Sequence, residues 1–198
     1  MTVIKIKDYG AVLSGVSVDK KEAMRYCAAG NGEGFLPILE ECIAEATPEI
    51  SYKVCYAEFP VSVLNERVSF GSFGVKSRDL AKNLAGCESA VIFCATLGIG
   101  IDRLIKKYSD ISPVRSLALQ GIGAERIEAL CDEFCLDVGN SVGKVRPRFS
   151  PGYGDFDISF QTKIFEVLQC GKKIGVTLNE SLLITPTKSV TAIIGIEK

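Results

Sequence analysis

Hydrophobic and polar positions follow two different periods along the chain, and these periods predict a mixture of strands and helices. An alternation of period two predicts extended segments at residues 3–7 and 52–58. Residues 89–98 form a near-continuous apolar run of strand length that stops at a glycine, which predicts a central strand. A short strand is expected near residues 174–178, and a closing strand over residues 189–196.

Apolar residues at helical spacing predict helices between these strands. Asp19 is placed to cap one helix, and Ser77 is placed to cap a short helix that ends near Gly86. Further helices are predicted over residues 33–46, 99–108, 113–138 and 159–169. Gly121 and Gly123 are expected to weaken or bend the long one, because a glycine inside a helix costs up to ~1 kcal/mol relative to alanine.

The order of these elements favours an α+β fold. About five strands are joined by irregular helical connections, without the regular strand-helix-strand repeat of a doubly wound sheet. The chain has 198 residues, of which 47% are hydrophobic, and a typical domain has roughly 150 residues, so we expect one domain over 1–198.

Charge and apolar patterning argue against several kinds of partner. The formal net charge of −1 provides no field that would steer the chain to nucleic acid or to an acidic membrane. No apolar run reaches the ~20 residues that span a bilayer, and the opening MTVIKIKDYG lacks the apolar core of a secretory signal. We therefore expect a cytoplasmic protein that binds neither nucleic acid nor membrane.

The eight cysteines fit the same location, because they lack the dense spacing of a secreted disulfide scaffold and are expected to be reduced thiols. Cys131 and Cys135 lie one helical turn apart, but there is no CxxC pair and no histidine, so we expect no metal site. Absent histidine also removes the commonest general base. Reactive atoms are therefore expected to come from a ligand or a partner.

Two glycine-containing stretches are weak candidates for phosphate loops. GSFGVKS at 71–77 and TLGIGIDR at 96–103 both lack the GxxxxGK[ST] and GxGxxG spacings. The second follows a strand and precedes a helix, so its N–H groups can face an anion, although a plain strand-to-helix turn is the more frequent meaning.

Residues 146–156, RPRFSPGYGDF, contain the most specific candidate site. Pro151 and Gly152 suit the centre of a type II turn, because proline presets the first φ and glycine accepts the positive second one. The guanidinium of Arg148 can grip a carboxylate, and the ring of Tyr153 can cover a flat base or attract a cation. A carboxylate, a purine and a cation occur together in S-adenosylmethionine. The residues alone fit equally a plain turn whose tyrosine fills the core.

This stretch and the segments after it resemble a known family. RFSPGYGDFDISFQTKIFEVLQ followed by IGVTLNESLLITPTKSVTAIIGI is similar to the C-terminal part of the reactivation domain of cobalamin-dependent methionine synthase, and above all to its free-standing activation subunits. VIFCATLG and the helix with EALCDEF resemble the family more weakly. The likeness covers residues 90–196, while residues 1–85 match nothing. It implies an α+β domain with a twisted, mainly antiparallel sheet.

The resemblance also implies a function. Such a domain binds S-adenosylmethionine and presents its methyl group to cob(II)alamin on a partner, a cobalamin-dependent methionine synthase, with an electron from a flavodoxin- or ferredoxin-type donor. Cobalamin is then bound only through the partner, and this chain is an accessory subunit. No residue is expected to be catalytic in the usual sense, because the transfer needs positioning more than a protein acid or base. The alternative is a non-catalytic docking module for a corrinoid protein of this or another methyltransferase system.

Residue by residue, the family's ligand arginine falls on Arg148, its small residue on Ser150 and its glycine-tyrosine pair on Gly152 and Tyr153. The resemblance implies that Arg148 binds the methionyl carboxylate. It places the family's ligand glutamate, from the helix before this loop, best at Glu128.

Three acids share a helical face by their spacing: Glu125, Glu128 and Asp132. One of them can therefore meet the ligand ammonium, although a solvated helix face explains any single one of them equally well. Where the synthase domain has a cysteine- and histidine-containing stretch after its tyrosine, this chain has GDFDISF. Contacts that the family makes there must come from elsewhere or be lost.

Overall fold

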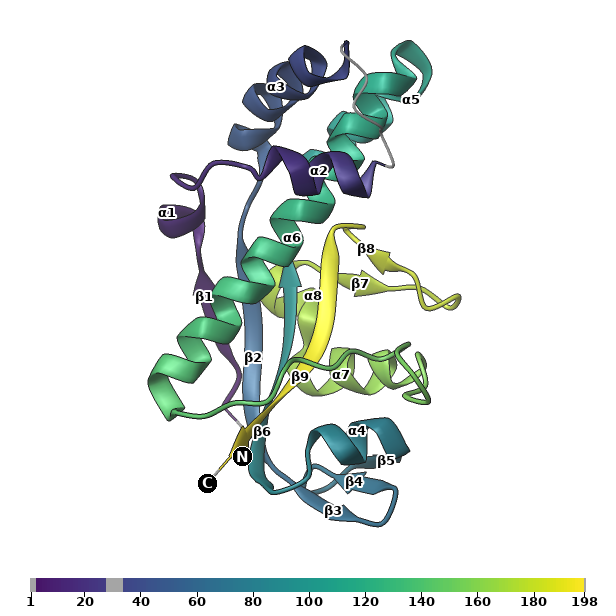
Figure 1. Cartoon of the computed structure of the whole chain (residues 1–198). Coiled ribbons are helices and arrows are strands. Elements are labelled where there is room, and N and C mark those ends of the chain that lie inside the picture. Colours follow the sequence, from purple (N-terminus) through teal and green to yellow (C-terminus); the bar gives the residue numbers. More distant parts are fainter. Residues whose placement is uncertain (1–2, 28–33, 198) are drawn as a thin grey trace.

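A four-stranded antiparallel sheet forms the centre of the computed structural model, which describes residues 3–27 and 34–197 (Figure 1). Its order is β1 (Lys5–Asp8), β2 (Lys53–Pro60), β6 (Cys87–Thr96) and β9 (Ser189–Glu197). The apolar run at 89–98 forms most of β6, which lies between β2 and β9 and is buried from Ala90 to Thr96. The prediction of a central strand is confirmed.

Alternate residues of β6 face two different cores. Phe93 lies in one buried cluster, and its neighbours Ile92 and Cys94 lie in the other. Phe134 covers Phe93 with a ring-to-ring distance of 4.8 Å. The helices on this face are α1 (Gly10–Leu13), α2 (Lys20–Tyr26), α3 (Phe35–Ala46) with the 3-10 turn η1 (Thr47–Glu49), α5 (Gly100–Ile111) and α6 (Pro113–Val142). Because side chains alternate across a strand, one apolar run supports both layers.

The opposite face carries smaller elements. Its helices are α4 (Arg78–Asn83), α7 (Phe160–Leu168) and α8 (Cys170–Ile174). A three-stranded sheet joins them, made of β3 (Ser62–Leu64), β4 (Arg67–Ser69) and β5 (Gly74–Lys76), with a hairpin of β7 (Thr177–Leu178) and β8 (Ile184–Thr185). In Figure 1, α6 crosses one face of the central sheet, whereas α7 and α8 lie on the other. The chain thus mixes helices with antiparallel sheet, as expected.

Two predicted helix caps are confirmed by side-chain hydrogen bonds. The Asp19 carboxylate accepts from the backbone N–H groups of Lys21 at 2.9 Å and Glu22 at 3.1 Å. The Ser77 hydroxyl accepts from the N–H of Leu80 at 3.1 Å. Because these N–H groups have no partner inside their own helix, the caps define where α2 and α4 begin.

Helix α6 continues through Gly121 and Gly123, the two glycines that were expected to weaken or bend it. A Cβ at Gly121 would lie 2.3 Å from the carbonyl oxygen of Ala23, and one at Gly123 would lie 2.9 Å from the side chain of Lys188. The glycines therefore let α2 and the start of β9 pack closely against α6, which offsets their low helix propensity.

The strands of the small sheet were missed by the sequence pattern. Each of β3, β4 and β5 has three residues, which is too short for an alternation to show, and their pairing depends on contacts with α4 and β6. The short elements α1, α8 and β8 were missed for the same reason. The first residue of the helix predicted over 33–46 lies outside the described residues.

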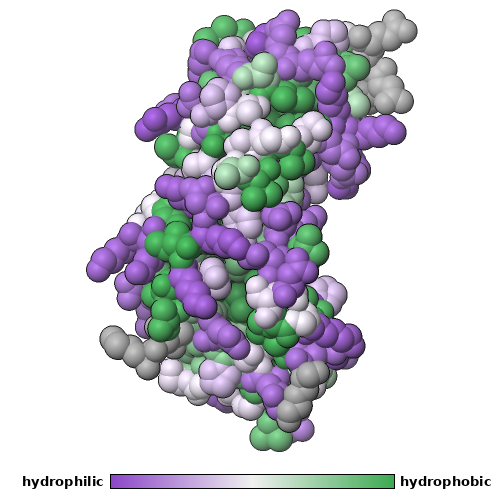
Figure 2. Space-filling view, turned by 90° about the vertical axis from the view of Figure 1, so that its left-hand side faces the viewer, coloured by the Kyte–Doolittle hydropathy of each residue, from purple (hydrophilic) through white to green (hydrophobic). Residues whose placement is uncertain are grey.

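The two edges of the central sheet differ. Strand β1 is an open edge that carries Lys5 and Lys7, a common protection against unwanted pairing. Figure 2, which faces the side of the molecule with β1, shows hydrophobic residues interspersed with hydrophilic ones. Within residues 3–27 and 34–197, none of the helices combines the length and the apolar character needed to cross a bilayer.

Candidate ligand site at the edge of strand β9

The other edge of the sheet is covered by the segment that sequence analysis singled out. Phe149 and Ile193 exchange two backbone hydrogen bonds of 2.9 Å, and the N–H of Arg146 donates to the carbonyl of Gly195 at 2.8 Å. The chain then leaves β9. The backbone groups of β9 that point away from β6 recur every second residue, so those of Thr191 point the same way as those of Ile193 and Gly195. Among the described residues, no strand pairs with Thr191 on that side.

The predicted turn follows immediately and is confirmed. Gly152 has a φ of +96°, which suits glycine, and the N–H of Tyr153 donates to the carbonyl of Ser150 at 3.3 Å. Tyr153 is 68% exposed, whereas Phe156 is 1% exposed and fills the core. A tyrosine that only fills the core is therefore excluded, and the ring of Tyr153 stays accessible beside Ser150.

Asp155, for which the sequence indicated no role, anchors this loop to α4. Its carboxylate accepts from the Ser77 hydroxyl at 2.7 Å and from the N–H groups of Arg78 at 2.9 Å and Asp79 at 3.0 Å. The hydrogen bond from Ser77, followed by those from Asp79 and Arg78, lowers the pKa of Asp155 to about 2. Gly154 in this loop has a φ of +54°, a backbone conformation that glycine adopts more readily than other residues.

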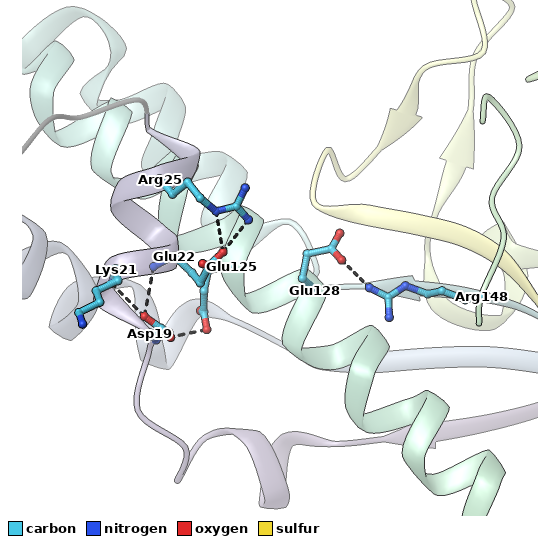
Figure 3. A network of polar contacts seen from close by, with 7 residues as sticks. All are labelled: Asp19, Lys21, Glu22, Arg25, Glu125, Glu128 and Arg148. Atoms are coloured by element: carbon cyan, nitrogen blue, oxygen red, sulfur yellow. Dashed lines mark hydrogen bonds and ion pairs between the residues drawn. The ribbon is translucent and has the colours of Figure 1, made fainter. Parts of the chain in front are cut away.

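Arg148 reaches from the covering segment to α6. One Nη lies 2.5 Å from the carboxylate of Glu128 (Figure 3), and the other donates to Asp132. The Arg148 side chain is 24% exposed. Burial works to lower the pKa of Arg148, but the hydrogen bond with Asp132 and the nearby charges, among them those of Asp132 and Glu128, together outweigh it, and the pKa stays above its ordinary value. The guanidinium is therefore always charged and already has two carboxylate partners.

The third acid of the predicted face points elsewhere. Glu125 is buried, pairs with Arg126 at 2.5 Å and accepts from the N–H of Asp19 at 3.2 Å. Figure 3 shows Glu125 directed to the side of α2, and Glu128 directed to Arg148. Of the three acids that share this face by spacing, Glu128 and Asp132 therefore meet Arg148, and Glu125 does not. Helical spacing predicts on which face a residue lies. Because each residue rises about 1.5 Å along the helix axis, acids on one face still lie at different positions along the helix and contact different neighbouring elements.

A cavity of about 800 Å³ lies around Arg148 at this edge of the sheet. Its lining comes from Glu128 and Cys135 of α6, residues 145–151 and Tyr153, Gln161 of α7, Ile184 of β8 and residues 189–191 of β9. Four of the five predicted site residues line it, namely Glu128, Arg148, Ser150 and Tyr153, whereas Gly152 shapes the turn. The structure thus brings Glu128 of α6 together with Arg148, Ser150 and Tyr153 of the loop at 146–156.

Gln161 is the lining residue that sequence reasoning missed. It lies on the buried side of α7, together with Phe160, Ile164 and Leu168. A polar residue at an apolar position of a helix was the available signal, because such residues usually need a partner when buried.

Most of the eight cysteines are distributed over several helices and strands. All eight are free thiols. Within the described part of the chain, no group of three or more His, Cys, Asp or Glu residues is arranged to hold a metal ion. Burial raises the pKa of the Cys131 thiol, one helical turn before Cys135 of the cavity wall, well above its ordinary value.

Comparison with known proteins found a match among solved structures and none among family models or curated sequences. No family model matches the sequence, and no curated protein sequence matches it. A crystal structure of the MetH reactivation domain bound to AdoHcy superimposes with a TM-score of 0.69 and 11% sequence identity, over 98% of this chain and 78% of that one. The chain has the fold of the MetH reactivation domain. Because the superposition covers 98% of this chain, it includes most of the N-terminal portion, where the sequence showed no resemblance.

Proposed function

We propose that the cavity binds S-adenosylmethionine or its demethylated product, and that the protein is a reactivation subunit for a cobalamin-dependent methionine synthase. The observation that carries the proposal is the convergence of Arg148 and Glu128 on a cavity of suitable size. It is supported by the reactivation-domain fold, since the crystal structure of that domain contains AdoHcy.

The amino-acid end of the ligand is complementary to the pair of charges in the cavity. Its carboxylate would take two hydrogen bonds from Arg148 in place of Asp132, whose side chain is 72% exposed and free to turn into solvent. Its ammonium would pair with Glu128. The zwitterionic ligand would thus remove the ion pair of Arg148 with Asp132 and form two others, from its carboxylate to Arg148 and from its ammonium to Glu128. No charge would be left buried without a partner.

The turn residues have separate parts in this proposal. Gly152 supplies the positive φ that places Tyr153 beside the cavity, where the exposed ring can cover the purine or the sulfonium. Ser150 lines the wall without the bulk that would close it. Reduced cobalamin on the partner would accept the methyl group, so this chain contributes position and charge, not an acid or a base.

The remaining partners follow from that chemistry. The proposal requires a corrinoid protein that docks where the methyl group is presented, and a flavodoxin- or ferredoxin-type donor of one electron. The free thiols of the chain fit the proposed cytoplasmic location, where thiols stay reduced.

The ligand is tested by calorimetric titration with S-adenosylhomocysteine. The wild type is expected to bind, and Arg148→Ala is expected to bind roughly tenfold or more weakly, because charge-assisted hydrogen bonds are lost. Arg25→Ala, in which an exposed arginine of another carboxylate pair is removed, is the matched control and should bind as the wild type does. Failure of the wild type to bind, alone or with a corrinoid partner, would contradict the proposal.

A second candidate is favoured by the pairing of Arg148 with two carboxylates of its own chain, which fills the place of a ligand carboxylate. This candidate is a non-catalytic docking module for a corrinoid protein. Mixing the protein with a cobalamin-loaded partner, S-adenosylmethionine and a reductant separates the two candidates. Formation of methylcobalamin, followed by absorbance, supports the reactivation subunit, whereas complex formation without ligand binding supports the docking module.

A further inference from the structure

The buried side chain of Gln161 makes no hydrogen bond with any part of the chain that the structure describes. It is 7% exposed, and its Oε1 is buried without a partner among the described residues. Most buried polar groups in folded proteins are paired, and an unpaired amide oxygen costs free energy. Because Gln161 also lines the cavity, a ligand there can supply the missing donor.

Gln161 differs from the other side chains that have a buried atom without a hydrogen bond. Asn83 donates from its Nδ2 to the carbonyl of Pro147, Arg115 pairs with Glu41, and Arg146 pairs with Glu197. Each of these side chains is thus held by another contact. Of the four such side chains in the described part of the chain, Gln161 alone makes no hydrogen bond or ion pair.

The position of Gln161 indicates which part of a ligand it would meet. Arg148 and Glu128 meet on the side of the cavity where α6 lies, whereas Gln161 belongs to α7, on the other face of the sheet (Figure 1). A ligand whose amino-acid end is held by Arg148 must extend across the edge of β9 to reach α7. Tyr153 and Ile184 add a flat ring and an apolar side chain to the lining.

A carboxamide is chemically suited to the base of such a ligand. Adenine presents an exocyclic amino donor beside a ring-nitrogen acceptor, and the amide of glutamine can bind both at once. Oε1 would accept from the amino group, and Nε2 would donate to the ring nitrogen. This pairing would satisfy the buried oxygen that the protein itself leaves without a donor.

We propose that Gln161 recognises the adenine base of the bound ligand and makes the site selective for a 6-aminopurine. This inference rests on the proposed function, because it names the residue that determines base specificity in the same cavity. Gln161 touches the base and not the reacting atoms, so it is a specificity residue rather than a catalytic one.

The test compares S-adenosylhomocysteine with its 6-oxo analogue, S-inosylhomocysteine, by calorimetry. The wild type is expected to prefer the adenosyl ligand by roughly tenfold or more, as for a bidentate amide contact to adenine. Gln161→Leu, which keeps the shape but removes both polar atoms, is expected to reduce the preference below about threefold. Gln120→Leu, at an exposed position of α6, is the matched control and should keep the preference of the wild type.

Stability without ligand gives an independent measurement. Since leucine buries no unpaired polar atom, the thermal midpoint of Gln161→Leu should equal or exceed that of the wild type. A clear decrease would mean that Gln161 has a structural partner and would overturn the inference. Equal affinities of the wild type for both ligands, or an unchanged preference in Gln161→Leu, would also overturn it. If neither ligand binds to the wild type, the proposed function fails together with the inference. If a ligand binds without the expected preference for adenine, only the inference about Gln161 fails.

Discussion

Two arginines meet carboxylates of helix α6, and their surroundings differ. Arg126 is 3% exposed, pairs with Glu125, and donates to the backbone carbonyls of Val16 at 3.0 Å and Ser17 at 3.4 Å. Arg148 has only side-chain partners, and both of these are substantially exposed. The first arginine fixes the chain before α2 to α6 beside a small cavity of about 180 Å³, while the second lines the cavity of about 800 Å³.

The difference between them separates a structural ion pair from an exchangeable one. Backbone carbonyls cannot turn away from Arg126, and the removal of either charge would leave the other buried alone. The carboxylate of Asp132 can turn into solvent at little cost, because exposed ion pairs contribute little stability. A ligand can therefore displace the partner of Arg148 but not the partners of Arg126.

Removal of Arg126 is expected to have the largest effect. Arg126→Ala leaves the carboxylate of Glu125 buried without its partner, so the free energy of unfolding should fall by about 3–5 kcal/mol. Urea unfolding followed by circular dichroism measures this loss. The double variant Arg126→Met with Glu125→Met should recover part of it, because no charge stays buried. A loss below about 1 kcal/mol would place Arg126 in the same class as Arg148.

Arg148→Ala is expected to separate binding from stability. The affinity for S-adenosylhomocysteine should fall roughly tenfold or more, while the free energy of unfolding should change by less than about 1 kcal/mol. Calorimetry and urea unfolding of the same preparation give the two values. If this variant unfolds as readily as Arg126→Ala, the proposed distinction is wrong.

Asp132→Asn is expected to strengthen binding modestly. The carboxylate of Asp132 competes with that of the ligand for Arg148, so its neutralisation should raise the affinity by up to about fivefold. Asp110→Asn, at an exposed position of α5, is the control for the loss of one negative charge. A weaker affinity in Asp132→Asn would mean that this acid binds the ligand and does not compete with it.

The loop that carries Tyr153 should show the smallest effect, as a change in acid stability. The pKa of Asp155 is about 2 in the folded protein, below the ordinary value of about 3.9 for the unfolded chain. Its carboxylate therefore contributes stability above pH ~4, and this contribution is lost as the pH falls from ~4 through ~2. Asp155→Asn should lose less stability than the wild type over this range, measured by urea midpoints. Identical acid dependence in both proteins would exclude the anchoring role.

The parts of the fold that depend on residues close together in the sequence could be predicted. The apolar run of β6 and the caps Asp19 and Ser77 are local signals, and the structure confirms them. The strands of the small sheet are too short for a period, and their existence depends on pairing between them. The close packing of Gly121 and Gly123 against other elements could not be predicted, because a helical pattern does not show which elements the helix contacts.

For the candidate site, too, local features could be predicted from the sequence and contacts between distant elements could not. The turn at Pro151 and Gly152 could be predicted from composition, whereas the ion pairs of Arg148 with two acids of α6 were not predicted. The resemblance pointed to Glu128, and this acid lies in the cavity wall, whereas spacing alone could not separate it from Glu125, which lies against a different element. Gln161 carried a signal in its apolar register, but only the tertiary structure shows that its oxygen has no partner.

The most direct test of the central claim observes both arginines at once. In an NMR titration with S-adenosylhomocysteine, the Nε–Hε resonance of Arg148 should shift and saturate with the ligand, because its guanidinium exchanges Asp132 for the ligand carboxylate. The resonance of Arg126, which is bound to backbone carbonyls and to Glu125, should stay unchanged. A ligand that binds to saturation without moving the Arg148 resonance, or one that moves Arg126 instead, would contradict the account.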